Sequence, residues 1–282
     1  MQNNENELIE ILVTIDQNYI KPLEVMLYSI KLNNMYGKFR IWVIYENISS
    51  EALFRLKRFA KKLNFQLNAL AMNNDFAFPE SLLNLHDYPE EMYFRLLSGN
   101  ILPRFLHKVI YLDPDILVIN SLLPLWQLDL QNAMFAAAAH KGLTDIVSSI
   151  NNLRLGTDTS YFNSGIMVLN LDKMRQKIKV QDIVDAINEN HDTLILPDQD
   201  ILNYLYSKYI LQIPEIKWNY DSRSYSVYLA KSSGKHNLEW VMKNTAIIHF
   251  CGKPKPWQTK SSNRFKVLYL NYQQLTNKLL QK

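Results

Sequence analysis

Glycine is scarce in this chain, with 7 glycines among 282 residues, whereas proteins average about 7%. Neither G-x-G-x-x-G nor G-x-x-x-x-G-K-[ST] occurs in the sequence, which excludes the two common loops that hold phosphates through backbone N–H groups. A protein that binds a diphosphate without such a loop must supply positive charge in another way. A divalent ion and a few basic side chains are the remaining means.

Cysteine and long apolar runs are also lacking. Cys251 is the single cysteine, so no internal disulfide can form and nothing indicates secretion. The longest run of small apolar residues, 133–139, is too short to span a membrane, and the polar, acidic residues 1–7 predict no signal peptide. With 48% apolar residues, the chain can bury one sizeable core, or at most two. We therefore expect a cytoplasmic protein of enzyme size.

Acidic residues are missing from the last part of the chain. Residues 240–282 contain eight basic residues and no acid. Because the whole chain has 31 basic and 27 acidic residues, residues 1–239 hold 23 and 27 of them and carry a net charge of −4. A mildly acidic body with a basic end predicts an anionic partner for that end.

Apolar patterns predict strands that alternate with helices through the first half of the chain. The predicted strands cover residues 10–15, 40–45, 65–70 and 108–112, and the predicted helices cover 21–32, 50–63 and 91–102. Such alternation is typical of a doubly wound α/β sheet with parallel strands, which binds ligands at the carboxyl ends of its strands. Asp16 and Asp113 both follow such strands, so we expect them to share one cleft.

The second half of the chain is less regular. It predicts strands over 134–139, 165–170 and 246–250 and helices over 180–190 and 199–206. The polar, irregular residues 141–161 favour a loop or a lid. No change in composition marks a second domain before the basic end. We therefore expect one domain over 1–260 and a basic amphipathic tail over 261–282.

Two carboxylates flank a proline where the strand over 108–112 ends. Pro114 has a fixed φ and biases Asp113 toward an extended backbone, so Asp113 and Asp115 are held close together at a rigid strand end. Two such anions repel each other, which favours a hard divalent ion between them. The alternative is a simple strand-end turn, because Asp-Pro is common in turns.

Four further local patterns accompany this Asp-Pro-Asp motif. They are Thr14-Ile15-Asp16-Gln17-Asn18-Tyr19, Phe162-Asn163-Ser164-Gly165, Leu196-Pro197-Asp198-Gln199-Asp200 and His249-Phe250-Cys251-Gly252-Lys253-Pro254-Lys255-Pro256-Trp257. Together and in this order, they resemble family 8 of the nucleotide-sugar glycosyltransferases, over residues 11–257. The resemblance implies a Rossmann-like A-type glycosyltransferase fold with a mixed, mostly parallel sheet. It also implies retaining transfer, as in bacterial lipopolysaccharide galactosyl- and glucosyltransferases and glycogenin.

The resemblance implies a metal site. Asp113 and Asp115 match the metal-binding Asp-x-Asp of the family, and His249 matches the third protein ligand of Mn²⁺, with Mg²⁺ as the alternative ion. Carboxylate and imidazole ligands together suit Mn²⁺ better than a structural zinc site. An isolated histidine in the position of His249 would be interpreted as a core residue at a strand end.

The resemblance also implies a set of donor-binding residues. They are Thr14, Asp16, Asn18, Tyr19, Arg95, Asp113, Asn163, Gly252 and Lys255. Tyr19 would stack on the uracil, and Gly252 would admit the donor phosphates, which Lys255 would contact. Without the resemblance, Tyr19 is a core aromatic residue, Arg95 a surface arginine and Asn163 a turn residue.

Asp198 and Gln199 match the catalytic positions of the family. Asp198 would hydrogen-bond the hydroxyls of the transferred sugar, and Gln199 would lie closest to the reacting face. Because an amide is a poor nucleophile, attack by the acceptor from that same face is favoured over a covalent intermediate. Asp200 is at least as well explained as a cap of the following helix.

The implied function is the metal-dependent transfer of glucose or galactose from a UDP-sugar to a glycan, lipid-linked or protein acceptor. Residues 76–88, which would face the acceptor, match no family pattern, and Ser164 replaces a frequent alanine without an expected cost. No nucleic-acid partner is expected. The alternatives are a non-catalytic nucleotide-sugar binding module of the same fold and a sugar nucleotidyltransferase, which normally needs a glycine-rich N-terminal loop.

The tail predicts an amphipathic helix. Its apolar stripe consists of Phe265, Leu268, Tyr272, Leu275 and Leu279, and its charges are all basic. A basic amphipathic helix favours weak peripheral binding to anionic lipids at the inner face of the membrane. The alternative is a helix that packs this stripe on the catalytic domain.

Overall fold

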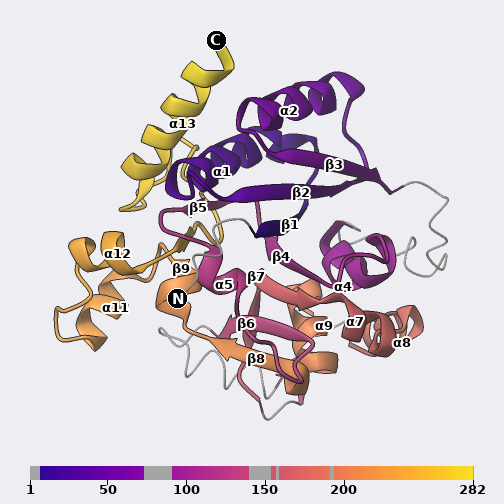
Figure 1. Ribbon diagram of the computed structural model, residues 1–282. Coiled ribbons are helices and arrows are strands. Elements are labelled where there is room, and N and C mark those ends of the chain that lie inside the picture. Colours follow the sequence, from indigo (N-terminus) through magenta and orange to yellow (C-terminus); the bar gives the residue numbers. More distant parts are fainter. Residues whose placement is uncertain (1–6, 73–90, 140–153, 157–158, 191–193, 282) are drawn as a thin grey trace.

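The computed structural model describes residues 7–72, 91–139, 154–156, 159–190 and 194–281 (Figure 1). In this part of the chain, seven strands form one sheet in the order β3-β2-β1-β4-β7-β6-β8. These strands are β3 (Gln66–Ala71), β2 (Lys38–Tyr45), β1 (Leu8–Thr14), β4 (Lys108–Leu112), β7 (Phe162–Asn170), β6 (Phe135–Ala139) and β8 (Ile210–Ile213). The strands β1, β2, β3 and β4 run parallel to one another, as predicted for the first half. β6 and β8 are parallel, whereas β7 is antiparallel to β4 and β6, so the sheet is mixed and mostly parallel.

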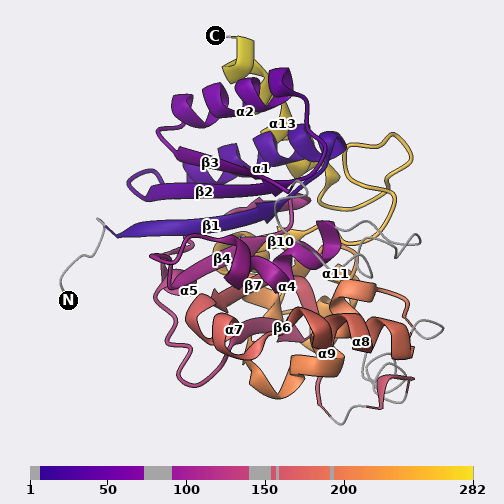
Figure 2. The same cartoon turned by 90° about the vertical axis from the view of Figure 1, so that its right-hand side faces the viewer.

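Helices cover both faces of this sheet (Figures 1 and 2). One face packs against α1 (Ile20–Asn33) and α2 (Ser50–Lys62), and the other against α4 (Glu91–Ile101), α7 (Leu171–Lys177), α8 (Val180–Asn190) and α9 (Pro197–Tyr206). The alternation of side chains along β1 explains this arrangement. Ile11 and Val13 belong to the core beneath α1 and α2, and Leu12 belongs to the core on the opposite face.

A second, three-stranded sheet has the order β5-β10-β9 in the described part of the chain. Its strands are β5 (Ile116–Val118), β10 (Ile247–His249) and β9 (Tyr220–Asp221), and the short helices near them are α5 (Leu123–Trp126), α10 (Glu215–Trp218), α11 (Tyr225–Lys231) and α12 (Leu238–Asn244). β10 is antiparallel to β5 and parallel to β9. Because only three residues separate the end of β4 from the start of β5, the segment with both predicted metal carboxylates joins the two sheets.

The predicted strands and helices are all present, with shifts of a few residues at their ends. The largest shift is that of the strand predicted over 165–170, which begins at Phe162 in β7. Asn163 therefore lies within a strand, and its alternative interpretation as a turn residue is wrong. The acceptor-facing segment 76–88 and most of the predicted loop or lid over 141–161 lie outside the described residues.

The predicted tail forms α13 (Lys266–Gln281), which packs against α1. Tyr272 is buried, and Asn33 Nδ2 donates to its hydroxyl at 2.9 Å. At the far end, Lys62 Nζ donates to the Leu279 carbonyl at 3.2 Å. Four residues of the predicted apolar stripe thus pack on the rest of the described chain: Phe265, Leu268, Tyr272 and Leu279. No helix within the described ranges is long and apolar enough to cross a membrane.

Candidate active site

One pocket of about 770 Å³ opens where β1 and β4 end, with β7, β10 and the start of α9 as further walls. Twelve of the thirteen predicted site residues line it: Thr14, Asp16, Tyr19, Arg95, Asp113, Asp115, Asn163, Asp198, Gln199, His249, Gly252 and Lys255. The remaining one, Asn18, is not among the lining residues, and its side-chain amide donates to Asp16 Oδ2 at 3.2 Å. The cleft expected from the strand ends is therefore present and contains both Asp16 and Asp113.

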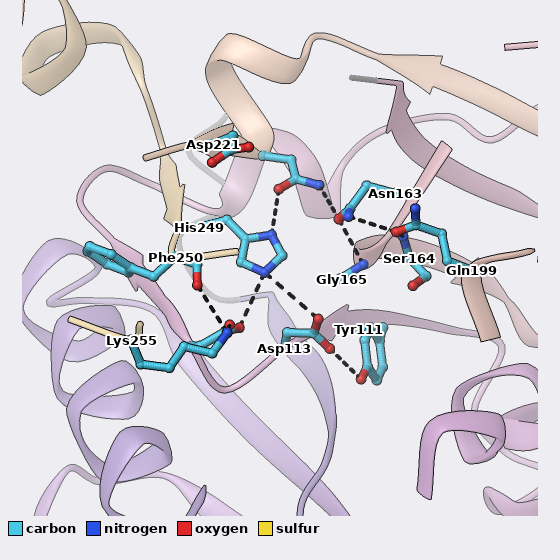
Figure 3. A network of polar contacts seen from close by, with 12 residues as sticks. Tyr111, Asp113, Asn163, Ser164, Gly165, Gln199, Asp221, His249, Phe250 and Lys255 are labelled. Atoms are coloured by element: carbon cyan, nitrogen blue, oxygen red, sulfur yellow. Dashed lines mark hydrogen bonds and ion pairs between the residues drawn. The ribbon is translucent and has the colours of Figure 1, made fainter. Parts of the chain in front are cut away.

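Three side chains that commonly bind metal ions converge in this pocket (Figure 3). One ligand atom from each of Asp113, Asp115 and His249 lies within 4.8 Å of the other two. His249 Nε2 is 3.2 Å from Asp115 Oδ1 and 3.9 Å from Asp113 Oδ2. Gly165 leaves room for them, because a Cβ at this position would lie 2.5 Å from His249 Cε1 and 2.6 Å from Asp113 Oδ2. Two carboxylates and one imidazole nitrogen suit a divalent ion such as Mn²⁺.

Backbone hydrogen bonds connect the two residues that carry the carboxylates, Asp113 and Asp115, to different sheets. The Asp113 N–H donates to the Gly165 carbonyl of β7 at 2.7 Å. The Asp115 carbonyl accepts from the Phe250 N–H at 3.0 Å, just after β10. His249 is opposite Ile116 in the β5–β10 register, so strand pairing places it beside Asp115.

A chain of amides orients the His249 ring (Figure 3). Its Nδ1 is 2.9 Å from Asn219 Oδ1, which can only accept, so Nδ1 carries a proton. Asn219 Nδ2 donates to Asn163 Oδ1 at 2.7 Å, and Asn163 Nδ2 donates to Gln199 Oε1 at 2.8 Å. These contacts fix the ring so that Nε2 is directed at the two carboxylates, as in metal sites whose histidine is held by its other nitrogen.

Asp115 lies among positive groups. Lys255 Nζ pairs with its carboxylate and also donates to the Phe250 carbonyl at 3.1 Å. Burial alone would raise the pKa of Asp115, but His249 and Lys255 lower that pKa well below its ordinary value. Burial lowers the pKa of His249, but Cys251 and Asp115 raise it well above its ordinary value.

Arg95 holds a second group of charges in the same pocket. Its guanidinium is 3.1 Å from Asp198 Oδ2 and 3.3 Å from Asp113 Oδ1, and it lies 4.6 Å from the centroid of the Tyr111 ring. Arg95 Nη1 also donates to Ser164 Oγ at 3.0 Å, and Ser164 Oγ donates to Asp198 Oδ2 at 2.9 Å. Burial raises the pKa of Asp198 although Arg95 lowers it. Arg95 is 8% exposed, so its alternative interpretation as a surface arginine is wrong.

Asp200 lies next to these residues but not in the pocket lining. Its buried carboxylate accepts from the N–H groups of Ile195 and Leu196 at 2.7 and 2.9 Å and pairs with Arg154 at 2.7 Å. These N–H groups precede α9, so Asp200 anchors the segment that leads into the helix. The geometry favours a structural role for Asp200 over a contact with substrate.

The residues after β1 form another wall of the pocket. Asp16 Oδ1 accepts from the N–H groups of Asn18 and Tyr19 at 2.8 and 3.1 Å, and thus caps the short helix η1 (Gln17–Tyr19). Tyr19 meets Trp257 edge-on, with 6.1 Å between ring centroids, and its remaining surface faces the pocket. Tyr19 therefore combines the predicted core packing with a position in the pocket wall.

Tyr111 connects the first strand to the cluster of Asp113, Asp115 and His249. Its hydroxyl is 3.0 Å from Thr14 Oγ1 and donates to Asp113 Oδ1 at 2.7 Å. This link could not be predicted from the sequence, because the pattern around Tyr111 indicates an ordinary residue of a buried apolar strand. The role of Asn219 could not be predicted either, because Asn219 precedes a two-residue strand with no recognisable pattern. Ser164 was expected to be neutral, whereas its hydroxyl bridges Arg95 and Asp198.

The chain is similar to several proteins of known family. The model of glycosyl transferase family 8 matches residues 10–261. General stress protein A of Bacillus subtilis is 27% identical over 96% of this chain and 95% of that protein. Lipopolysaccharide 1,2-glucosyltransferase of Escherichia coli is 27% identical over 94% of this chain and 79% of that protein.

A solved structure gives the same result for the fold. Galactosyltransferase LgtC in complex with donor and acceptor sugar analogues superposes with a TM-score of 0.78, at 26% identity, over 95% of this chain and 96% of that chain. The mixed, mostly parallel sheet is therefore that of the A-type glycosyltransferase fold. On the extent of the match to the family model, the chain belongs to glycosyl transferase family 8.

Proposed function

We propose that the protein transfers glucose or galactose from a UDP-sugar to a glycan, lipid-linked or protein acceptor, with retention at the anomeric carbon and with Mn²⁺ or Mg²⁺ as cofactor. The observation that carries the proposal is the position of the Asp113, Asp115 and His249 cluster in one pocket with Lys255, Asp198 and Gln199. Anion-neutralising groups and sugar-binding groups thus lie together, as transfer from a nucleotide-sugar requires.

Asp113, Asp115 and His249 would hold the divalent ion. The fit is supported by the convergence of their ligand atoms and by the space that Gly165 leaves beside them. When bound, such an ion neutralises the diphosphate and draws charge from the departing UDP. Lys255 already compensates one carboxylate of this cluster and would turn toward the phosphates, which Gly252 allows to approach its backbone.

The residues around Asp198 would bind the transferred sugar. Asp198 accepts from Arg95 and Ser164, so its carboxylate is held in place and would accept further bonds from sugar hydroxyls. Gln199 Oε1 accepts from Asn163 Nδ2 and from the Ser164 N–H at 3.3 Å, which fixes its amide. An amide so held is a poor nucleophile but a good dipole beside a sugar that develops positive charge. Attack by an acceptor hydroxyl on the face that UDP leaves then gives retention.

Thr14, Asp16, Asn18 and Tyr19 would bind the uridine. Tyr19 and Asp16 line the pocket, which supports stacking on the base by the first and a polar contact by the second. Asn18 is not among the lining residues, so any contact with the ribose requires its side chain to leave Asp16.

Peripheral association with the inner face of a membrane would depend on the exposed surface of α13. The predicted apolar stripe of α13 is used for packing, but Val267 and Leu270 on the same helix are 76% and 38% exposed. Exposed apolar groups near Arg264 and Lys278 would favour loose contact with anionic lipids. Such contact would keep a cytoplasmic enzyme near lipid-linked acceptors.

The proposal is tested by release of UDP from UDP-glucose and UDP-galactose, with Mn²⁺, with Mg²⁺ and with a chelator, in the presence of glycan and lipid acceptors. The anomeric configuration of the product, determined by NMR, tests retention. Asp113→Asn should abolish metal-dependent turnover, and Glu189→Gln, an exposed charge change on α8, should not. Tight UDP binding without turnover of either donor would favour the alternative of a non-catalytic binding module.

A further inference from the structure

A second cavity, of about 320 Å³, adjoins the candidate active site. Its size is at the lower end of the range for small-molecule sites, roughly 300–1,000 Å³. It lies between the turn after β9, the loop after β10 and the segment that precedes α13. No role for this cavity follows from the donor-binding residues described above.

The cavity is lined by positive and hydroxyl groups. Its basic residues are Arg223, Lys253 and Arg264, its hydroxyl groups include those of four serines, and none of its lining residues is an acid. Ser222 and Ser261 are buried, so their hydroxyl groups belong to the inner wall. Such a set of cations and hydroxyl donors is suited to an anion with several oxygen atoms.

Two of the three cations lack a carboxylate partner. Arg223 is held by Asp221, with 2.7 Å between Arg223 Nη2 and Asp221 Oδ2. For Lys253 and Arg264, no ion pair forms with any residue in the part of the chain that the structure describes. Arg264 instead lies over the Tyr225 ring, 4.5 Å from its centroid, which positions its guanidinium at the cavity. The cavity therefore carries a net positive charge.

The cavity and the donor pocket share one wall. Arg223, Cys251 and Lys253 line both. Gly252 lies between them, with φ +69°, and a Cβ there would lie 2.7 Å from Arg223 Nη1. The glycine thus allows the Arg223 guanidinium to lie against the loop that separates the two spaces. A molecule bound in the cavity could extend past this loop to the reacting end of the donor pocket.

We propose that the acceptor of this glycosyltransferase carries a phosphate group, which the cavity formed by Arg223, Lys253 and Arg264 binds. The donor diphosphate would be bound by Lys255 and by an ion at Asp113 and Asp115. The cations of the second cavity therefore serve a different molecule. A sugar or polyol phosphate fits, because a dianion matches two unpaired cations and its hydroxyls can reach the donor pocket. The phosphate itself is only bound and takes no part in the transfer.

This inference rests on the proposed function, and the experiment separates the two. The protein is first saturated with UDP and Mn²⁺, so that phosphate cannot bind at the metal-ligating cluster, and glycerol 3-phosphate is then titrated in by calorimetry. Absence of UDP binding contradicts the proposed function. Binding of UDP without binding of glycerol 3-phosphate contradicts the phosphate-bearing acceptor alone.

Three variants and one further probe locate the site. Arg264→Gln should weaken glycerol 3-phosphate binding about tenfold, because a charge-assisted hydrogen bond is lost. Arg264→Lys keeps the charge and should lose less. The control Lys260→Gln removes the same charge from the same segment, outside the cavity lining, and should bind like the wild type. Glucuronate, a monoanion, should bind several-fold more weakly than the phosphate.

Two results would overturn the assignment. The first is equal affinity of the wild type and Arg264→Gln for glycerol 3-phosphate, or equal losses in Arg264→Gln and Lys260→Gln. The second is binding of glucuronate as tight as that of glycerol 3-phosphate, which would exclude recognition of a phosphate dianion. Arg223→Gln provides an independent check, because it removes another cation of the cavity and should also weaken phosphate binding.

Discussion

Replacing Arg95 with methionine should destabilise the protein by about 3–5 kcal/mol at about pH 7. The guanidinium is within 3.1 Å of Asp198 and 3.3 Å of Asp113. The Asp198 side chain is 6% exposed, so after the substitution its charge would be buried without a positive partner, although Ser164 Oγ would still donate to it. Asp113 is 21% exposed and keeps its hydrogen bond from Tyr111, so most of the loss comes from Asp198.

The loss should depend on pH in a defined direction. Burial already raises the pKa of Asp198, and Arg95 is the group that lowers it. In Arg95→Met this pKa rises further above its value in the unfolded chain, so the folded state binds the proton more tightly. The variant is therefore least stable above the folded pKa, and its deficit relative to the wild type should shrink as the pH falls from about 7 to about 5.

Urea denaturation followed by circular dichroism measures these differences, with Arg104→Met as the matched control. Arg104 is exposed on the surface, so its substitution should change the free energy of unfolding by less than about 0.5 kcal/mol. The double variant Arg95→Met/Asp198→Asn should recover much of the loss, because it removes the unpaired charge. A loss below about 1 kcal/mol for Arg95→Met, or no recovery in the double variant, would refute the argument from a buried uncompensated carboxylate.

Three further outcomes are expected. UDP and Mn²⁺ should each raise the affinity for the other by the same factor, because the diphosphate has no glycine-rich loop to bind it; calorimetry with equal UDP affinity in chelator and in Mn²⁺ would contradict this. Gly165→Ala should fold but lose metal affinity, since its methyl group would overlap with His249 and Asp113; unchanged Mn²⁺ binding would disprove the overlap. Val267→Ser/Leu270→Ser should reduce co-sedimentation with anionic vesicles at low salt, and recovery equal to that of the wild type would exclude α13 as the contact.

The sequence predicted the elements whose pattern is local. The carboxyl ends of β1 and β4 could be located because each is a buried apolar run that stops at a polar group, and parallel strands end at the same edge. Asp16 and Asp113 were placed in one cleft for this reason. The second sheet could not be predicted, because β5, β9 and β10 have two or three residues each and pair across long stretches of chain.

The polar network was the least predictable part of the site. Asn219 and Ser164 act through partners that are distant in sequence, and neither residue type indicates such a role by itself. The burial of Arg95 was also hidden, because arginine in an isolated helix normally faces water. It is buried here only because β4, β7 and α9 bring Asp113, Ser164 and Asp198 to it.

Pro114 separates two carboxylates whose backbones are bonded to different sheets. An ion held jointly by Asp113, Asp115 and His249 would cross-link those sheets. Local opening of the segment that joins the sheets should then be rarer when the ion and a diphosphate are bound. Exchange of the Asp113 and Phe250 amide hydrogens should slow by a similar factor. The Asp113 amide is bonded to Gly165 of the first sheet, and the Phe250 amide is bonded to Asp115 next to the second sheet. Ligand occupancy in this enzyme therefore also determines how rigidly its two sheets are joined.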